Sequence, residues 1–346
     1  MRPVLAITMG DPGGIGPEII VKALSDKGVY DICSPVVIGD YEALSDALRF
    51  CGLNLAINEI SRPQNALGEF GRVDLINLGY LQKGSWEYKK ISRVCGLSSF
   101  GYIRAAVELA LSGAVRGVVT APISKESINK AGINYSGHTE IFADLTRATN
   151  YGMLLTNDKM RVIHVTTHVS LEKACKMITT ERTLNVIKLA DEALKAFGVK
   201  NPRIAVAGLN PHAGENGLFG NEEETIIKPA VAGAQSEGIL AEGPFPPDTV
   251  FAKAIGGACD VVVAMYHDQG HIPFKLSSFR LDADTNTFSS VSGVNCTVGL
   301  PVIRTSVDHG TAFDIAGEGR ASEESMIDAI KTAVLMAKVK FRGELE

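Results

Sequence analysis

Short runs rich in Val and Ile alternate along this 346-residue chain with longer segments of helical periodicity. Strands that are covered on both faces read as continuous apolar runs, and parallel strands need a long crossover, usually a helix, between them. The alternation therefore predicts an α/β fold with parallel-rich sheets. The expected strands are Val4–Thr8, Pro35–Asp40, Val73–Leu78, Gly117–Ala121, Arg161–Thr167, Arg203–Leu209, Asp260–Tyr266 and Val302–Ser306.

Helical periodicity is clearest in Ser99–Leu111, Thr180–Phe197 and Ser322–Val339, and the second of these stops at a glycine. The length predicts about two domains. No linker is visible, so any division requires the chain to cross over and return. The polar segment Phe279–Gly293 is expected to form a hairpin or a flexible excursion near the functional site.

Composition excludes several function classes. A net charge of -5 and a pI near 5.9 provide no basic surface for nucleic acid. The first apolar run is too short for a signal peptide, and no stretch approaches the roughly 20 residues of a membrane span. The six cysteines show no close pairs. We expect a cytoplasmic protein that binds neither membrane nor nucleic acid.

Three histidines, His168, His212 and His267, each follow an apolar run that reads as a buried strand. In an open α/β sheet, the loops at the carboxyl ends of the strands converge on one crevice, where ligands bind. Imidazole suits zinc and similar divalent ions, and catalytic sites often use three protein ligands. We therefore predict a metal site. Asp248 and Asp268 could complete the coordination or orient the histidines, while His164 is interpreted as a satisfied core residue.

Several other segments carry groups that could hold an anion. The glycine-rich loop Thr8–Glu18 could cradle a phosphate or carboxylate at a helix N-terminus, or could simply be a tight turn; it lacks a dinucleotide fingerprint. Polar side chains with the same potential follow or end apolar runs elsewhere. These candidate substrate-binding residues are His138, Thr139, Lys275, Asn295 and Arg304.

The loop that follows the last expected strand is dense in polar and small residues. It could wrap an adenine and a ribose, with aspartate accepting hydrogen bonds from the ribose hydroxyls. The candidate nucleotide-binding residues there are Asp308, His309, Gly310, Thr311 and Asp314.

Taken together, these blocks resemble the 4-hydroxythreonine-4-phosphate dehydrogenase family of vitamin B6 synthesis over essentially the whole chain. The matching segments are Ile7-Thr-Met-Gly-Asp-Pro, Gly137-His-Thr-Glu, Asn210-Pro-His-Ala-Gly-Glu, Met265-Tyr-His-Asp-Gln-Gly and Asp308-His-Gly-Thr-Ala-Phe-Asp-Ile-Ala-Gly. The resemblance implies a fold like isocitrate and isopropylmalate dehydrogenases, with two α/β domains and the active site in the cleft between them. We expect 1–121 plus 269–346 as the domain with the nucleotide loop, and 122–268 as the domain with the metal ligands and the dimer interface.

The resemblance also implies NAD as cofactor and a homodimer with shared active sites. Each site would hold one divalent ion (zinc, magnesium or cobalt) on His168, His212 and His267. The implied reaction oxidises C3 of a 4-phosphorylated substrate and then removes the carboxylate. Lys275 is the candidate for proton transfer, and Asp248 and Asp268 are further catalytic candidates.

Two departures from the biosynthetic pattern favour a catabolic branch. His271 stands where biosynthetic members usually carry Leu, and the segment after His168 reads Val-Ser-Leu instead of Val-Pro-Leu. The favoured substrates are therefore 4-phospho-D-threonate and 4-phospho-D-erythronate, which give dihydroxyacetone phosphate, with His271 as an extra donor for the substrate hydroxyl. The alternative is 4-phosphohydroxy-L-threonine, in pyridoxal phosphate synthesis. A phosphate acyltransferase and a non-catalytic phosphosugar sensor are remoter alternatives, and the histidine triad argues against the former.

Overall fold

The structure is a computed structural model that describes residues 1–282, 287–291 and 293–345. It divides into two compact units: unit 1 comprises Met1–Thr149, Val291–Val294 and Leu300–Glu346, and unit 2 comprises Asn150–Ser290 and Asn295–Gly299. These bounds differ from the expected ones at two segments. Residues 122–149 belong to unit 1 because α5 (Lys125–Lys130) and α6 (His138–Thr146) pack on α4 (Arg93–Leu111). Residues 269–290 belong to unit 2, where α11 (His267–Ser278) packs on β7 and β10.

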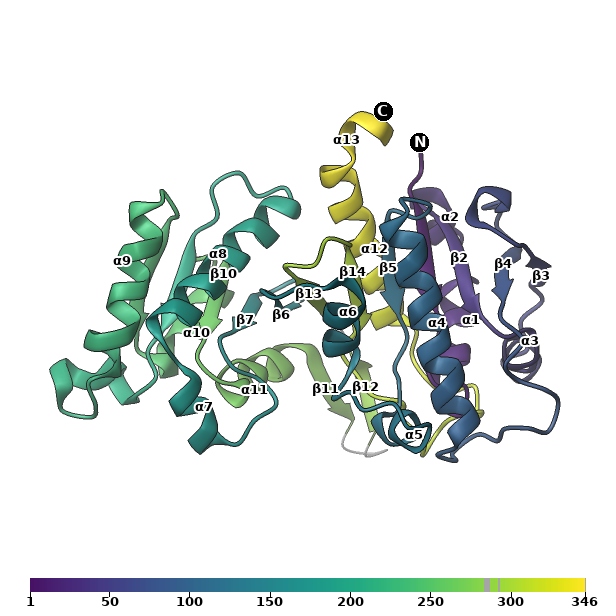
Figure 1. Cartoon of the computed structure of the whole chain (residues 1–346), viewed down its shortest axis with the longest axis horizontal. Coiled ribbons are helices and arrows are strands. Elements are labelled where there is room, and N and C mark those ends of the chain that lie inside the picture. Colours follow the sequence, from purple (N-terminus) through teal and green to yellow (C-terminus); the bar gives the residue numbers. More distant parts are fainter. Residues whose placement is uncertain (283–286, 292, 346) are drawn as a thin grey trace. The chain divides into compact units, whose positions relative to one another are not determined.

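The strands of unit 1 lie in the order β3-β4-β2-β1-β5-β14, and each of these neighbouring pairs is parallel (Figure 1). The carboxyl ends of β5 and β14 therefore lie side by side, which places the residues that follow them close together. The strand bounds are β1 Val4–Thr8, β2 Ser34–Gly39, β3 Ala56–Glu59, β4 Arg72–Asn77, β5 Gly117–Thr120 and β14 Arg304–Val307.

Helices α4 and α12 (Glu324–Lys340) both pack on the strands of unit 1. The remaining helical elements of the unit are α1 Gly16–Ala23, α2 Lys27–Ile32, α3 Tyr41–Phe50, η1 Pro63–Asn65 and α13 Arg342–Leu345. One expectation needs correction, because α4, at 19 residues with a mean hydropathy of 1.3, is long and apolar enough to cross a membrane. Its Tyr102, Ile103 and Ala106 are buried, as in a core helix.

In unit 2 the strand order is β13-β6-β7-β10-β8-β9, with β10 parallel to both β7 and β8 and β6 antiparallel to β7. The bounds are β6 Gly152–Thr156, β7 Arg161–His164, β8 Ile204–Ala207, β9 Ala241–Phe245, β10 Val261–Ala264 and β13 Val294–Val298. A separate two-stranded sheet pairs β11 (Phe279–Asp282) with β12 (Thr287–Val291), as the hairpin prediction requires. The turn of that hairpin, 283–286, lies outside the described residues.

The core of unit 2 places α10 and α11 against its central strands. Val162, Val262 and Ala264 from the strands meet Phe251 of α10 and Phe274 of α11. The helical elements of the unit are α7 Leu171–Met177, α8 Thr180–Ala196, η2 Pro211–Gly217, the π-helical turn η3 Glu223–Ile227, α9 Lys228–Ser236, α10 Pro247–Ile255 and α11. Because α11 begins directly after β10, the histidines of its first turns are held by a rigid strand-to-helix connection.

Candidate functional site

Three adjacent parallel strands of unit 2 lead to the three predicted metal ligands. In the order β7-β10-β8, the strands are followed by His168, His267 and His212, respectively. The apolar runs therefore led to the correct strands, and each histidine follows the carboxyl end of its strand. This is the edge at which α/β proteins place ligands.

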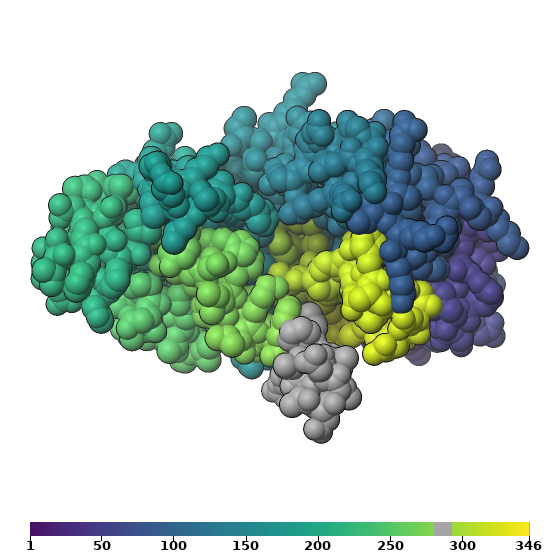
Figure 2. Space-filling model, turned by 90° about the horizontal axis from the view of Figure 1, so that it is seen from below, coloured from purple at the N-terminus to yellow at the C-terminus, as the bar shows by residue number. Residues whose placement is uncertain are grey.

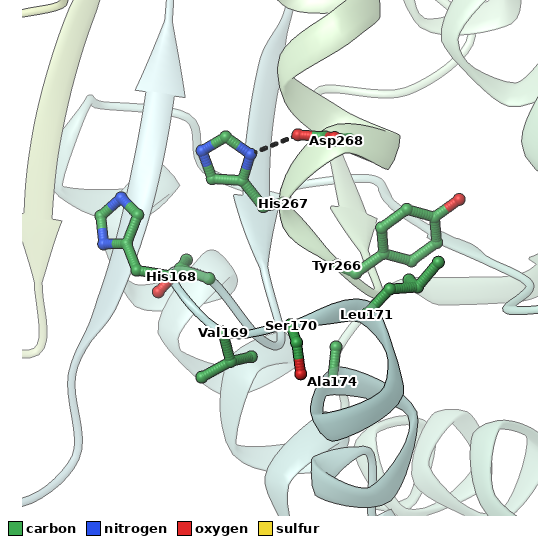
Figure 3. Close-up of a pocket in the computed structure, with 9 residues that line it drawn as sticks. His168, Val169, Ser170, Leu171, Ala174, Tyr266, His267 and Asp268 are labelled. Carbon is green, nitrogen blue, oxygen red and sulfur yellow. Dashed lines mark hydrogen bonds and ion pairs between the residues drawn. The ribbon is translucent and has the colours of Figure 1, made fainter.

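His168 and His267 lie close together at one pocket of unit 2, with their ring centroids 5.6 Å apart. The pocket has a volume of about 370 Å³, and its walls come from 167–171, Ala174 and 266–268. Figure 3 shows Asp268 beside one ring nitrogen of His267, while the other ring nitrogen lies on the side of His168. The Nδ1 of His267 lies 2.6 Å from Oδ1 of Asp268, so Nδ1–H donates to the carboxylate. That contact leaves the Nε2 lone pair for a ligand.

The donor chemistry of this pair fits a divalent ion, because a carboxylate that orients one imidazole is a common support for a metal ligand. His212 does not join the pair: it lies exposed in η2 with φ 52°, and its ring is 6.2 Å from that of Phe219. Within the described ranges of this single chain, no three His, Cys, Asp or Glu side chains are grouped to hold a metal. The three-histidine set therefore stays a prediction, and the resemblance implies that each ion is shared between two subunits.

Two more histidines pack behind His267. His271 stacks on it, with ring centroids 3.7 Å apart and ring planes 11° apart, and its Nδ1 lies 3.1 Å from Nε2 of His164. His164 is fully buried on β7, and its Nδ1 approaches the Met153 carbonyl oxygen at 3.4 Å. The interpretation of His164 as a satisfied core histidine is confirmed. Sequence reasoning missed its pairing with His271 because 107 residues separate the two.

Burial keeps both of these histidines neutral. It is the main cause that lowers the pKa of His164 to about 3, with a further contribution from the charge of His271. For His271, burial and then the charge of His267 lower the pKa to about 4. Each ring therefore carries one proton at neutral pH, so each has one donor and one acceptor nitrogen.

The three predicted catalytic residues lie at different places in unit 2. Asp268 is exposed and pairs with His267, as described. Lys275 lies two turns further along α11, with its ammonium 4.4 Å from the centroid of the Phe279 ring. Asp248 is exposed in the first turn of α10 and is not a wall of the 370 Å³ pocket.

Unit 1 brings together His138, Thr139 and Arg304 of the predicted substrate residues. His138 and Thr139 begin α6, and Arg304 begins β14 with only 2% of its surface exposed. The Arg304 Nη2 donates to Oγ1 of Thr120 at 2.7 Å, and its guanidinium lies 5.7 Å from the centroid of the Phe142 ring.

The ring of His138 completes this group. Its Nε2 is shielded from solvent and has no hydrogen-bond partner in the described part of the chain. Burial, assisted by the positive charge of Arg304, lowers the pKa of His138 well below its usual range. A buried guanidinium beside a half-buried imidazole whose shielded Nε2 has an unmet hydrogen bond is suited to an anionic ligand.

Asn295 lies in unit 2, on β13. Its side-chain oxygen is shielded from solvent and, among the residues described, makes no hydrogen bond. This oxygen could accept a hydrogen bond from a ligand, and the substrate contact of Asn295 stays a prediction.

The predicted nucleotide residues form the loop that follows β14 in unit 1. Asp308 donates its N–H to Oγ of Ser325 at 3.3 Å, and Nδ1–H of His309 donates to the Gly310 carbonyl at 3.0 Å. The glycine-rich loop contacts this loop, since the N–H of Ile15 donates to the Thr311 carbonyl at 3.0 Å. A side chain at Gly14 would clash with Thr311, with only 2.9 Å between the added Cβ and the Thr311 Cβ. The glycines therefore serve the close approach of the two loops.

A third loop, residues 82–92, contacts the other two, and no motif in its sequence marks this role. The N–H of Lys89 donates to the Gly13 carbonyl at 2.8 Å, and its Nζ donates to the Asp314 carbonyl at 2.8 Å and pairs with Glu318. Lys89 makes these contacts from a left-handed backbone conformation, with φ 64°. On the face of unit 1 shown in Figure 2, the blue segment that includes this loop meets the yellow C-terminal segment.

Known proteins are similar to this chain along almost its whole length. A protein of Oceanobacillus iheyensis named "Putative D-threonate 4-phosphate dehydrogenase" is 47% identical over 341 residues, covering 98% of this chain and 99% of that protein. The crystal structure of 4-hydroxythreonine-4-phosphate dehydrogenase from Klebsiella pneumoniae superimposes with a TM-score of 0.85 at 44% identity, covering 97% of this chain and 98% of that one.

The acyltransferase alternative can be compared in the same way. A branched-chain phosphotransacylase from Enterococcus faecalis V583 matches with a TM-score of 0.52 at 13% identity, covering 96% of this chain and 99% of that one. At that identity the likeness shows a common fold alone. By contrast, the family model described as "Pyridoxal phosphate biosynthetic protein PdxA" matches residues 31–333. The chain therefore belongs to the PdxA family.

Proposed function

We propose that this protein oxidises C3 of 4-phospho-D-threonate or 4-phospho-D-erythronate with NAD and a divalent metal ion, and then releases the carboxylate as carbon dioxide. Membership in a family whose solved relatives are dehydrogenases makes the chain an oxidoreductase. The observation that carries the choice of substrate is the full-length similarity to relatives named D-threonate 4-phosphate dehydrogenase, from 44% to 47% identical.

The reaction balances without a further co-reactant. The C3–H hydride passes to NAD and the C3 hydroxyl gives up its proton, which makes a 3-keto acid. A carboxylate that is β to a ketone leaves as carbon dioxide, and C2 then takes up a proton. The product is dihydroxyacetone phosphate. When bound, the metal ion would act as a Lewis acid that lowers the pKa of the substrate hydroxyl.

In this proposal the side chains of the two units have separate roles. His168, His267 and His212 would hold the ion, with Asp268 orienting His267. His138, Thr139 and Arg304 would bind an anionic group of the substrate, assisted by Asn295. The loop at Asp308–Asp314 would bind NAD. The ammonium of Lys275 would supply the proton to C2.

The alternative substrate is 4-phosphohydroxy-L-threonine, as in the biosynthesis of pyridoxal phosphate. The name of the Klebsiella pneumoniae structure, at 44% identity, favours it. His271 and its contact with His164 favour the phosphosugar acids, since this polar pair stands where the resemblance expects an apolar residue. The predicted homodimer and cytoplasmic location stay with the proposal.

The test is NADH formation by the purified, EDTA-treated protein after zinc, magnesium or cobalt is restored. It is run in parallel on 4-phospho-D-threonate, 4-phospho-D-erythronate and 4-phosphohydroxy-L-threonine. We expect metal-dependent turnover with the highest kcat/KM on a phosphosugar acid. A higher kcat/KM on the amino acid would contradict the choice of substrate, and metal-independent turnover would contradict the histidine site.

A further inference from the structure

Five atoms form a continuous series of close polar contacts through the interior of unit 2. The Met153 carbonyl oxygen lies 3.4 Å from His164 Nδ1, and His164 Nε2 lies 3.1 Å from His271 Nδ1. His271 Nδ1 also lies 3.1 Å from the carbonyl oxygen of His267. His164 is fully buried and His271 is 8% exposed, so the protein alone must satisfy these contacts.

The two carbonyl oxygens fix the direction of the series. A carbonyl can only accept, so His164 Nδ1 carries the hydrogen that faces Met153, which leaves its Nε2 as an acceptor. His271 Nδ1 then carries a hydrogen that serves both this Nε2 and the His267 carbonyl. The opposite arrangement would turn two nitrogen lone pairs toward two carbonyl oxygens. His271 is therefore held with Nδ1–H and a bare Nε2.

The close packing of α11 on β7 is what brings His271 of the helix next to His164 of the strand. A Cβ added at Gly270 would lie 2.4 Å from Nε2 of His164, so the absence of a side chain lets the helix approach the strand. Within α11 itself, one helical turn places the His271 ring nearly parallel to the His267 ring, with centroids 3.7 Å apart. His267 is thus held on one face by His271 and at its Nδ1 by Asp268.

We propose that His164 and His271 are a positioning pair for His267, which they hold as a preoriented metal ligand through a hydrogen-bond series that starts at the Met153 carbonyl. The role as metal ligand rests on the proposed function, whereas the tautomers do not. The geometry also changes the role expected for His271 from its sequence: a bare Nε2 accepts a hydrogen bond, so His271 is not the extra donor that the sequence suggested.

The tautomers can be measured on the metal-free protein labelled with ¹⁵N-histidine, by two-bond ¹H–¹⁵N correlation at pH 7.5. We expect His164 and His271 in the Nδ1–H form, assigned by the loss of signals in the His164→Leu and His271→Leu variants. An Nε2–H form for either residue would overturn the proposed series. This readout requires neither metal nor turnover.

The effect on the metal is measured by competition between the protein and a chromophoric chelator for Zn²⁺ alone. Partners that orient a metal ligand typically change metal affinity about 10- to 100-fold. We expect a Kd increase in that range for His271→Leu, and a smaller increase for His271→Phe, which keeps a flat ring but removes the hydrogen bond. Phe274→Leu is the control for general loosening of α11, since Phe274 packs in the apolar core, and it should leave the Kd within about 2-fold.

The double variant His164→Leu/His271→Leu separates positioning from stability. Replacing both hydrogen-bonding partners with apolar residues lowers stability less than replacing only one, because a single replacement leaves the other partner buried without a hydrogen bond. We therefore expect the double variant to be folded and still to bind Zn²⁺ weakly. Wild-type affinity in the double variant would overturn the proposal. A wild-type protein that takes up no Zn²⁺ would instead contradict the proposed function, while the tautomer result would stand.

Discussion

The hydrogen bond between Asp268 and His267 gives the most direct test of the metal site at the scale of single residues. In Asp268→Asn the amide no longer accepts with a full negative charge, so His267 loses the partner that fixes its tautomer. We expect the Kd for Zn²⁺ to rise about 10- to 100-fold while the circular dichroism spectrum stays unchanged.

Glu172→Gln is the matched control for Asp268→Asn. It removes a carboxylate that pairs with Lys176 on the exposed surface of α7. The Kd for Zn²⁺ should stay at the wild-type value in this variant. Equal losses in both variants would mean that overall charge, and not the contact with His267, sets the affinity.

Lys275 is the candidate proton donor of the proposed reaction. General acid–base catalysis typically contributes about 10²- to 10⁴-fold, so Lys275→Ala should lower kcat by a factor in that range. The substrate should still bind, as measured by isothermal titration. Near-normal turnover of Lys275→Ala would remove the proton-transfer role.

Sequence reasoning at this scale found residues that follow strands, because apolar runs mark the strands and polar side chains mark their ends. It reached His168 and His267 in this way, whereas Arg304, expected at the end of a strand, is the first residue of β14. It could not assign the tautomer of His271, since which ring nitrogen carries the proton depends on Met153 and His164, which lie far away in the chain. The catalytic role expected for Asp248, which is exposed in the first turn of α10, stays a prediction.

Among the secondary-structure elements, α11 can pack closely on β7 because Gly270 has no side chain. Ala in a helix is favoured over Gly by roughly 0.5–1 kcal/mol, but overpacking typically costs about 1–3 kcal/mol. An added Cβ at Gly270 would lie 2.4 Å from His164 Nε2 and 2.7 Å from Val162 Cγ1. We therefore expect Gly270→Ala to lower the free energy of unfolding in urea by about 1–2 kcal/mol.

Gly343→Ala tests the opposite case, because a Cβ at that helical position meets no atom within 4 Å. It should leave the free energy of unfolding unchanged or slightly raised. A gain in stability at Gly270 as well would mean that α11 and β7 have room to separate.

Lys89 holds the three loops of unit 1 together. Loss of a hydrogen bond from its side chain typically costs about 0.5–1.5 kcal/mol, so Lys89→Met should raise the KM for NAD about 2- to 10-fold. The KM for the phosphorylated substrate should not change. Trp86 is the single tryptophan of the chain and lies in the same loop, so its fluorescence reports whether the loop itself has moved.

Lys90→Met is the control, because the Lys90 side chain pairs with Glu87 on the exposed surface. It should leave both KM values unchanged. If Lys89→Met raised the two KM values equally, the contact with Asp314 would have no specific role in nucleotide binding.

Each of the eight strands expected from apolar runs overlaps a strand of the structure, with ends that differ by at most three residues. The run after Thr180 also ends as predicted, since Gly198 takes a left-handed φ of 87°. Strands β6 and β13 were missed although they are largely buried. Strands β3 and β9 were missed because they are polar or contain Gly and Pro, and all their residues except Ala241 are partly or fully exposed. Their pairing with β4 and β8 depends on neighbours that a local pattern does not report.

For the molecule as a whole, buried His164 links stability to pH. Its pKa is lowered from 6.5 to about 3 on folding, so the unfolded chain binds more protons between these two values. The free energy of unfolding is therefore expected to fall as the pH decreases from about 6.5, by at most about 1.4 kcal/mol per pH unit for this one group. Urea unfolding at pH 7.5, 6.5, 5.5 and 5.0 measures it.

The His164→Leu variant replaces this titratable imidazole with an apolar side chain of similar volume. Below pH 6.5, the free energy of unfolding of the variant should depend less steeply on pH than that of the wild type. Between pH 6.5 and 7.5 the two slopes should be the same. A slope that the substitution leaves unchanged would assign the pH dependence to other groups.

The expected domain bounds differ from the two compact units because no break in composition marks the crossings and the resemblance gave no packing information. The two helices α5 and α6 stay with unit 1 through contacts with α4, and the segment after β10 stays with unit 2 through α11. Two α/β units with sheets rich in parallel strands could be predicted from the sequence. The residues at which the chain crosses between the units could not.

The place of β14 has a consequence for how the chain is made. Unit 1 needs β14 and α12 from the end of the chain to complete the edge of β5, whereas almost all of unit 2 lies between residues 150 and 299. During synthesis on the ribosome, β1 to β5 therefore emerge first, but one edge of β5 stays unpaired until β14 has been synthesised. The half that is translated later can close first, so the earliest part of the protein to exist is the last to finish folding.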